Sequence, residues 1–246
     1  MSWSSAARRS VTPSEPPVLK AMILAAGRGE RMRPLTDHTP KSLLEVNGKP
    51  LILMIISSLA RAGVRELVIN LAHLGEKIAA HLGDGAAFGA SISYSRETEA
   101  LETAGGIAYA MPLLGDTPFI AVNADVYSDY DFAAMVQTAQ QLKAGGPLAH
   151  LVLVDNPPQH PRGDFALVDG CVQHEGSTKF TFSGIGAYHP ALFSGVPRGA
   201  RARLADLLIA AMPAGQITGE LYRGRWHDIG TPERLAAIDH AERNAS

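Results

Sequence analysis

The chain has almost no cysteine and no long apolar run. Its 246 residues include one cysteine, Cys171. A single cysteine excludes an intramolecular disulfide and a cysteine-based zinc cluster, which is typical of proteins in a reducing cytoplasm. The longest apolar run, near residues 51–56, is far shorter than the ~20 residues that a membrane-spanning helix needs. The sequence therefore predicts a soluble, cytoplasmic protein with no membrane partner.

The chain also lacks a large net charge. Its 22 Lys and Arg residues nearly balance 24 Asp and Glu residues, giving a formal net charge of −2. No field of the whole molecule would attract nucleic acid, so any anion site must be local. The nine histidines show no zinc-ligand spacing. We therefore expect neither a nucleic-acid partner nor zinc.

Strand-like and helix-like segments alternate from residue 20 to about residue 155. This alternation predicts βαβ units and a mostly parallel sheet covered by helices on both faces. From residue 156 the pieces are shorter and strand-like, which favours antiparallel additions, with helices near 203–212 and from Pro232. The expected fold class is α/β: a Rossmann-like, mostly parallel or mixed sheet flanked by helices, with a small antiparallel part.

The composition indicates one domain over residues 18–246, made of halves 18–155 and 156–246. Residues 1–17 contain Ser, Pro and Arg but no apolar stretch, which is typical of a disordered leader. In open α/β sheets, ligands bind outside the carboxyl ends of the strands. Three loops are expected there, at 27–41, 102–106 and 123–131, and together they indicate a binding site.

The first of these loops lies in LAAGRGERMRPLTDHTPK and combines glycines with cations. Gly27 and Gly29 have the G-x-G spacing of a dinucleotide-binding turn, but Met32 replaces the third glycine, and no P-loop motif is present. Backbone N–H groups of such a turn can hold phosphate oxygens, and the planar guanidinium of Arg31 can donate paired hydrogen bonds to them. Lys41 follows Pro40, whose restricted backbone limits the positions from which the long Lys41 side chain can extend. The loop predicts a phosphate site.

Two aspartates follow strand-like segments. Asp125 lies in VNADV after a buried run, and Asp228 lies in WHDIGTPER, where Thr231 and Pro232 are suited to the N-cap and first position of a helix. Carboxylate oxygens suit Mg²⁺, which keeps several waters beside one or two carboxylates. The pair predicts a magnesium site, although a turn or capping role for Asp228 stays open.

The motifs LAAGRGERMRPLTDHTPKSLLEVNGKPLI, VNADV and WHDIGTPERL together resemble those of the sugar-1-phosphate nucleotidylyltransferases, over residues 20–240. Within that family, LETAGGI, DNPPQHPRGDFALV, FTFSGIGAYHP and YRGRWHDIGT most resemble uridylyltransferases acting on N-acetylmuramate 1-phosphate in bacterial cell-wall recycling. The resemblance implies Mg²⁺-dependent transfer from UTP to a sugar 1-phosphate, giving a UDP-sugar and pyrophosphate, by a monomer or small homo-oligomer. It also assigns nucleotide binding to the first half and sugar binding to the second.

The resemblance also implies residue roles. Catalytic roles fall on Arg31, Lys41, Asp125 and Asp228, with the two aspartates as magnesium ligands. The nucleotide-binding residues would be Ala25, Ala26, Gly27, Arg28, Gly29, Arg31, Thr103 and Gly105. The sugar-binding residues would be Asn123, Gly163, Asp164, Ser183 and Gly184.

The chain departs from the family pattern at three places. Glu102 replaces a glycine, Phe182 replaces an asparagine, and the lysine that meets the sugar phosphate has no clear counterpart except Lys179. The lactyl carboxylate of N-acetylmuramate would favour a nearby cation, for which Arg162, Arg223 and Arg225 are candidates.

Three alternatives stay open at the level of sequence. The first is a nucleotidylyltransferase of other specificity, such as mannose-1-phosphate guanylyltransferase. The second, a nicotinamide-dependent oxidoreductase, is disfavoured by the missing third glycine. The third, a non-catalytic nucleotide sensor, is disfavoured because it would not need both aspartates.

Overall fold

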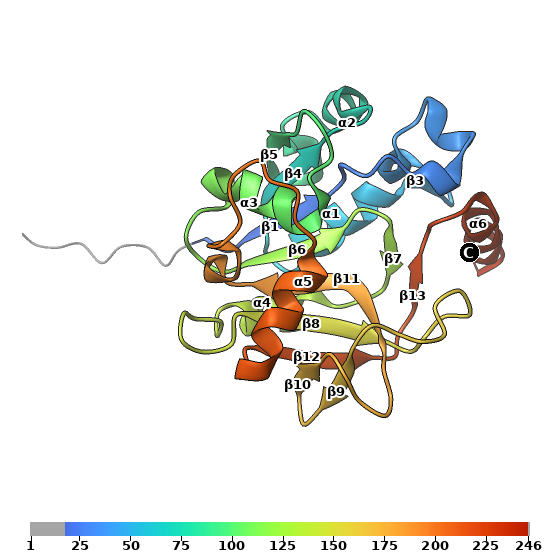
Figure 1. Ribbon diagram of the computed structural model, residues 1–246. Helices are drawn as coiled ribbons and strands as arrows, with labels where there is room; N and C mark the ends of the chain where they lie inside the picture. The colour runs from blue at the N-terminus through green and yellow to red at the C-terminus, as the bar shows by residue number, and fades with distance from the viewer. Residues whose placement is uncertain (1–17, 246) are drawn as a thin grey trace, which may run out of the picture.

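One mixed sheet of nine strands forms the centre of the protein in the computed structural model, which describes residues 18–245 (Figure 1). The leader expected at residues 1–17 lies outside the described residues. The strands, in spatial order, are β5 (Ser91–Arg96), β4 (Glu66–Leu71), β1 (Lys20–Leu24), β6 (Phe119–Asn123), β11 (Thr181–Tyr188), β8 (Ala149–Val154), β12 (Ile217–Tyr222), β10 (Cys171–Gln173) and β9 (Ala166–Val168). Both halves of the chain contribute strands to it.

The first four strands are parallel, and the three inner ones, β4, β1 and β6, carry apolar side chains on both faces, as their sequences predict. In β1, Ala21 and Ile23 face one core and Met22 faces the other, and all three are fully buried. Burying a side chain of the size of Ile or Met contributes about 1.5–3 kcal/mol. One face is covered by α1 (Leu51–Arg61), α2 (Gly75–Leu82) and α4 (Phe132–Ala139). The other is covered by α3 (Glu102–Leu114) and α5 (Leu204–Ala211), of which α5 lies in front of the sheet in Figure 1.

The second half adds antiparallel strands, with one exception. β11 runs antiparallel to β6 and to β8, and β10 runs antiparallel to both β9 and β12. β12, however, pairs with β8 in parallel, whereas the sequence predicts only antiparallel additions. The amides of Leu148 and Ala149 both donate to the carbonyl of Gln216, so both strands start at the same edge of the sheet. β11 also ends at this edge, where Tyr188 pairs with Ala149, and after α5 the chain begins β12 there on the other side of β8. β12 therefore runs opposite to β11 and parallel to β8, an order that short strand-like segments do not reveal.

A smaller unit lies beside the carboxyl ends of the parallel strands. Its elements are the hairpin β2 (Glu45–Val46) and β3 (Lys49–Pro50), the antiparallel pair β7 (Val126–Ser128) and β13 (Trp226–Asp228), and α6 (Pro232–Ala245). In Figure 1, β7 and β13 lie between the sheet and α6. Thr231 caps α6, as predicted, by accepting the Arg234 N–H at 3.4 Å. Met32 and Ile229 are fully buried in the core of this unit, which joins the glycine loop to β13. Within residues 18–245, no helix has the length and apolarity to cross a bilayer.

Candidate active site

A cleft of about 430 Å³ lies where three parallel strands end, as the loop positions predict. At this edge Leu24 of β1 pairs with Asn70 of β4 on one side and with Asn123 of β6 on the other. The cleft brings together nine residues predicted for the site: Ala25, Ala26, Gly27, Gly29, Arg31, Lys41, Thr103, Asn123 and Asp125. They come from three separate loops, so the cleft forms only when the sheet forms.

The glycine loop makes a tight turn along one wall. Gly29 has φ +68°, which a side chain disfavours, and a Cβ there would lie 3.0 Å from the Thr36 methyl carbon. The Gly29 carbonyl accepts hydrogen bonds from the Met32 N–H at 2.9 Å and the Thr36 hydroxyl at 2.8 Å. Around Gly27, in contrast, no atom would contact a Cβ within 4 Å. Gly29 is therefore required by the fold, while Gly27 leaves open space in the cleft.

The cations of this loop differ in their partners. Arg31 lines the cleft with an exposed side chain, and no carboxylate in the described chain pairs with it. Lys41 forms an ion pair with Asp125 and is largely buried. Arg28 pairs instead with Glu30 at 3.1 Å and lines a neighbouring cavity. Arg31 and Lys41 are thus positioned to meet anionic groups in the cleft, and the role of Arg28 stays a prediction.

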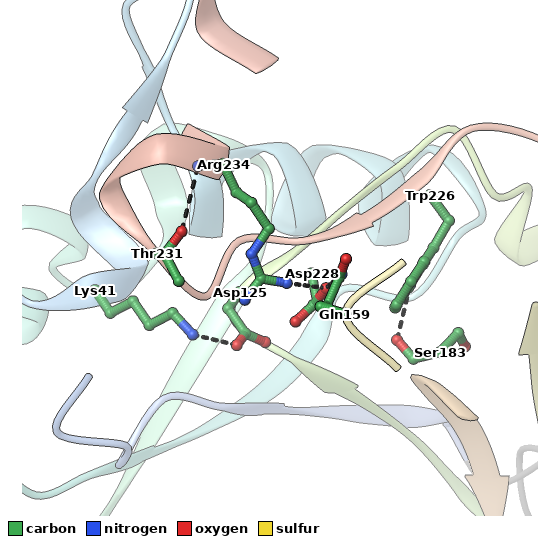
Figure 2. A network of polar contacts seen from close by, with 8 residues as sticks. All are labelled: Lys41, Asp125, Gln159, Ser183, Trp226, Asp228, Thr231 and Arg234. Carbon is green, nitrogen blue, oxygen red and sulfur yellow. Dashed lines mark hydrogen bonds and ion pairs between the residues drawn. The ribbon is translucent and has the colours of Figure 1, made fainter. Parts of the chain in front are cut away.

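Asp125 lies in the turn directly before β7, and Asp228 ends β13, the strand that pairs with β7. Asp125 lines the main cleft, whereas Asp228 lines a neighbouring cavity. The Ile229 N–H donates to the Asp125 carbonyl at 3.0 Å, and Asp228 is in register with Val126. Figure 2 shows Lys41 and Arg234 pointing toward these two carboxylates. The Arg234 guanidinium donates to Asp228 at 2.6 Å. Segments about 100 residues apart are thus joined through the β7–β13 pair, which sequence motifs alone could not establish.

The chemistry of this pair of carboxylates is compatible with magnesium, whose binding here stays a prediction. The side chains of Asp125 and Asp228 are 27% and 31% exposed, so both reach solvent. Gln159 also donates to Asp228 at 2.8 Å, beside a second cavity of about 360 Å³. Across the described residues no group of three or more protein ligands could hold a metal. Since Mg²⁺ typically takes one or two carboxylates plus phosphates and waters, two aspartates suffice.

A buried polar network in the lining of the cleft was not predicted from the sequence. Asn70 accepts the Ala25 N–H at 2.8 Å and donates to Glu97 at 2.7 Å. The other Glu97 oxygen accepts the Leu101 N–H at 3.1 Å. Burial raises the pKa of Glu97, while the bonds from Asn70 and Leu101 oppose that rise. The network ties the start of the glycine loop to β4 and β5, and its signal in the sequence is a polar residue directly at or after each strand-like run.

Two of the five predicted sugar residues, Asn123 and Asp164, line a side pocket of about 240 Å³. Thr103 and Asn123 line both this pocket and the main cleft, and Asp164 lines the pocket. One Asp164 oxygen accepts the Phe182 N–H at 2.8 Å, and the other lies 3.0 Å from His160 Nε2. The pocket therefore opens from the cleft and has a fixed polar wall.

The three other predicted sugar residues line neither the main cleft nor the side pocket. Gly184 packs on Asn123, since a Cβ there would lie 2.6 Å from the amide nitrogen. The Ser183 hydroxyl accepts the Ile185 N–H at 3.1 Å, and its carbonyl accepts the Trp226 indole N–H at 2.9 Å (Figure 2). Gly163 packs against the backbone of Lys179. Their direct contact with a sugar stays a prediction.

Some predicted cations are paired with other residues. Lys179 forms an ion pair with Glu175 at 3.2 Å, and Arg223 lies 3.8 Å from Asp155. Arg225 pairs with Glu242 and lines the second cavity. Arg162 is exposed and does not line the cleft or the side pocket. None of these four cations lines the main cleft or the side pocket.

Gly105, predicted as a nucleotide-binding residue, lies in the first half of α3. A Cβ at this position would lie 2.4 Å from the Ala200 carbonyl oxygen, and the Gly105 N–H donates to the Ala202 carbonyl at 3.1 Å. The glycine therefore allows the segment before α5 to lie directly on α3. Its contact with nucleotide stays a prediction.

Comparisons with known proteins agree with this geometry. Residues 20–167 match the family model described as nucleotidyl transferase. The chain is 53% identical over 221 residues to the N-acetylmuramate alpha-1-phosphate uridylyltransferase of Neisseria meningitidis serogroup B, covering 88% of this chain and 95% of that protein. It is 30% identical over 225 residues to the mannose-1-phosphate guanylyltransferase catalytic subunit beta of Danio rerio, covering 87% of this chain and 62% of that protein.

A solved structure shares the fold. It is a protein from Bacillus anthracis, crystallised with sucrose and assigned as a glucose-1-phosphate thymidylyltransferase. The TM-score is 0.80 at 23% identity, with 92% of this chain and 95% of that chain covered. This similarity confirms the predicted α/β fold with its mixed sheet.

Proposed function

The chain belongs to the nucleotidyl transferase family, and we propose that it transfers the uridylyl group of UTP to N-acetylmuramate 1-phosphate. The products would be UDP-N-acetylmuramate and pyrophosphate. The observation that carries the proposed reaction is the pairing of β13 with β7, which brings Asp228 beside Asp125 (Figure 2). Asp125 lines a cleft walled by a glycine turn with Arg31 and Lys41. The high identity to the Neisseria relative supports the choice of uridylyl donor and acceptor sugar.

The reaction needs no nucleophile from the protein. A phosphate oxygen of the sugar 1-phosphate attacks the α-phosphorus of UTP, a new P–O bond forms, and the bond to the departing pyrophosphate breaks in line. Catalysis then consists of positioning and of neutralising charge. The open turn at Gly27 and the unpaired Arg31 would hold the departing phosphates. Lys41, which is held at the cleft by Asp125, would neutralise negative charge near the α-phosphate.

Asp125 and Asp228 would hold the magnesium ion. When bound, such an ion neutralises phosphate charge and so favours attack on the α-phosphorus. The two carboxylates are already balanced by Lys41 and Arg234, so the site can form before the ion binds. This arrangement holds the aspartates in place, ready to accept a divalent cation.

Placement in a pathway is part of the proposal. The product would be a nucleotide-activated cell-wall sugar, which suits peptidoglycan recycling in the cytoplasm, where UTP is made. Guanylyl transfer to mannose 1-phosphate is the second candidate, because it would use the same phosphate and metal groups; the lower identity of that relative disfavours it. A nucleotide sensor would not need both aspartates.

The test is pyrophosphate release with Mg²⁺ over a grid of UTP and GTP, each against the 1-phosphates of N-acetylmuramate, N-acetylglucosamine, glucose and mannose. The proposal expects its highest kcat/KM for UTP with N-acetylmuramate 1-phosphate. A higher value for GTP with mannose 1-phosphate would favour the guanylyltransferase. Binding of UTP without turnover in any combination would favour the sensor.

A further inference from the structure

The side pocket carries a cation that the sequence did not single out. Arg203 lines the 240 Å³ pocket together with Asn123, Asp164 and Phe182. Thr103 and Asn123 line both this pocket and the cleft, so a sugar whose phosphate lies near Asp125 can extend toward Arg203. We propose that the Arg203 guanidinium binds the lactyl carboxylate of the acceptor sugar, an inference that rests on the proposed function.

Arg203 is available for an anionic ligand. Its side chain is exposed, and in the part of the chain that the structure describes no carboxylate forms an ion pair with it. Asp164, in the same pocket, already accepts the Phe182 N–H and lies 3.0 Å from His160. Glu102, also in the pocket lining, pairs with Arg201 at 3.3 Å. A substrate carboxylate would therefore not have to displace a protein carboxylate from Arg203.

The backbone before Arg203 is fixed against α3. The Ala202 N–H donates to the Leu101 carbonyl at 3.1 Å, and the Ala202 carbonyl accepts the Ala104 N–H at 3.0 Å and the Gly105 N–H at 3.1 Å. The missing side chain of Gly105 makes this close contact possible. The backbone that carries Arg203 is therefore fixed at the edge of the pocket, so less conformational entropy is lost when the guanidinium binds a ligand.

Other cations are less suitable. Arg223 and Arg225 are engaged with Asp155 and Glu242, and Arg225 faces the second cavity. Arg162 lies outside the lining of the side pocket. Arg203 also offers two parallel N–H groups to one carboxylate, a geometry that fixes both the position and the orientation of the lactyl group.

The test compares three acceptors with UTP: N-acetylmuramate 1-phosphate, its lactyl methyl ester, and N-acetylglucosamine 1-phosphate. The ester keeps the bulk of the lactyl group and removes its charge. For Arg203→Ala we expect kcat/KM on the acid to fall about 10- to 30-fold, mainly through KM, as for a partly exposed charge-assisted hydrogen bond. Activity on the ester and on N-acetylglucosamine 1-phosphate should stay within about threefold of wild type.

Two further variants separate charge from structure. Arg203→Lys keeps the charge and should retain activity on the acid within about fivefold of wild type. Arg198→Ala removes a guanidinium from the same segment, where it stacks 4.5 Å from the Tyr109 ring centre, and should preserve the preference for the acid.

The outcomes distinguish this inference from the proposed function. If wild-type enzyme does not use N-acetylmuramate 1-phosphate, both the proposed function and this inference are wrong. If wild type uses it but Arg203→Ala weakens all three acceptors equally, Arg203 has only a structural role and the carboxylate subsite is wrong. Loss of the preference in Arg162→Ala, with Arg203→Ala unchanged, would move the subsite to Arg162.

Discussion

The buried network in the lining of the cleft gives a prediction whose size can be worked out from the structure. Asn70 is 3% exposed and is the hydrogen-bond partner of two other buried groups, the Ala25 N–H and the Glu97 carboxylate. Asn70→Leu keeps a similar volume, so the contribution of a new cavity is small. Each buried group that loses its partner costs about 1–3 kcal/mol, so for two groups we expect a loss of about 2–6 kcal/mol in the free energy of unfolding.

The assay is equilibrium unfolding in urea, with Ser42→Ala as the matched control. The Ser42 hydroxyl is also buried at the cleft but has no hydrogen-bond partner in the described structure, so its removal should be neutral or stabilising. In Asn70→Leu the KM for UTP should also rise, because Ala25 begins the turn that lines the cleft. An Asn70→Leu variant within about 1 kcal/mol of wild type would refute the reasoning that these bonds fix the turn.

Three further predictions concern the same cleft. Gly29→Ala should lower the free energy of unfolding by about 1–2 kcal/mol in thermal or urea unfolding. Gly29 has φ +68°, and the added Cβ would lie 3.0 Å from the Thr36 methyl carbon. An unchanged free energy of unfolding would contradict this. Lys41→Met should lower kcat about 100-fold at saturating substrates, and a kcat within about fivefold of wild type would remove Lys41 from catalysis. Burial raises the pKa of Glu97 above 4.5, so folded protein binds this proton more tightly than unfolded protein, and this contribution to stability is lost as pH rises through the folded pKa. The stability of Glu97→Gln relative to wild type should therefore increase from pH 4 to pH 7 in urea titrations, and a constant difference would contradict it.

The parallel half of the fold and the cleft could be predicted from sequence because local signals determine them. Strands such as β1 are apolar on both faces, and such strands need helices on both sides. The glycine turn and Asp125 follow such strands, so the rule for open sheets locates them at one edge. Asp228 lies on β13, outside this sheet, and only the pairing of β13 with β7 brings it to Asp125.

Features that depend on distant pairing could not be predicted in this way. The direction of β12 follows from its position on the other side of β8 from β11, and the signal of a short strand is the same in either direction. The bond between Asn70 and Glu97 joins two strands, and neither residue has a distinctive local motif. Arg203 faces the side pocket because a backbone contact with α3 holds its segment there.

Glycines illustrate the same limit. The sequence suggests nucleotide contact for both Gly27 and Gly105, but their surroundings differ. Gly27 has open space in the cleft, whereas a Cβ on Gly105 would lie 2.4 Å from the Ala200 carbonyl oxygen. A glycine that approaches a ligand and one that approaches another segment look alike until the structure is known.

The central claim is that Asp125 and Asp228 together form the site of nucleotidyl transfer. The most direct measurement is a ³¹P NMR time course with UTP, N-acetylmuramate 1-phosphate and Mg²⁺, for wild type, Asp125→Asn and Asp228→Asn. We predict that wild type forms pyrophosphate and the sugar diphosphate signal together, and that each variant is slower by about 10²–10³ while remaining folded. Turnover within about tenfold of wild type in either variant would contradict the claim.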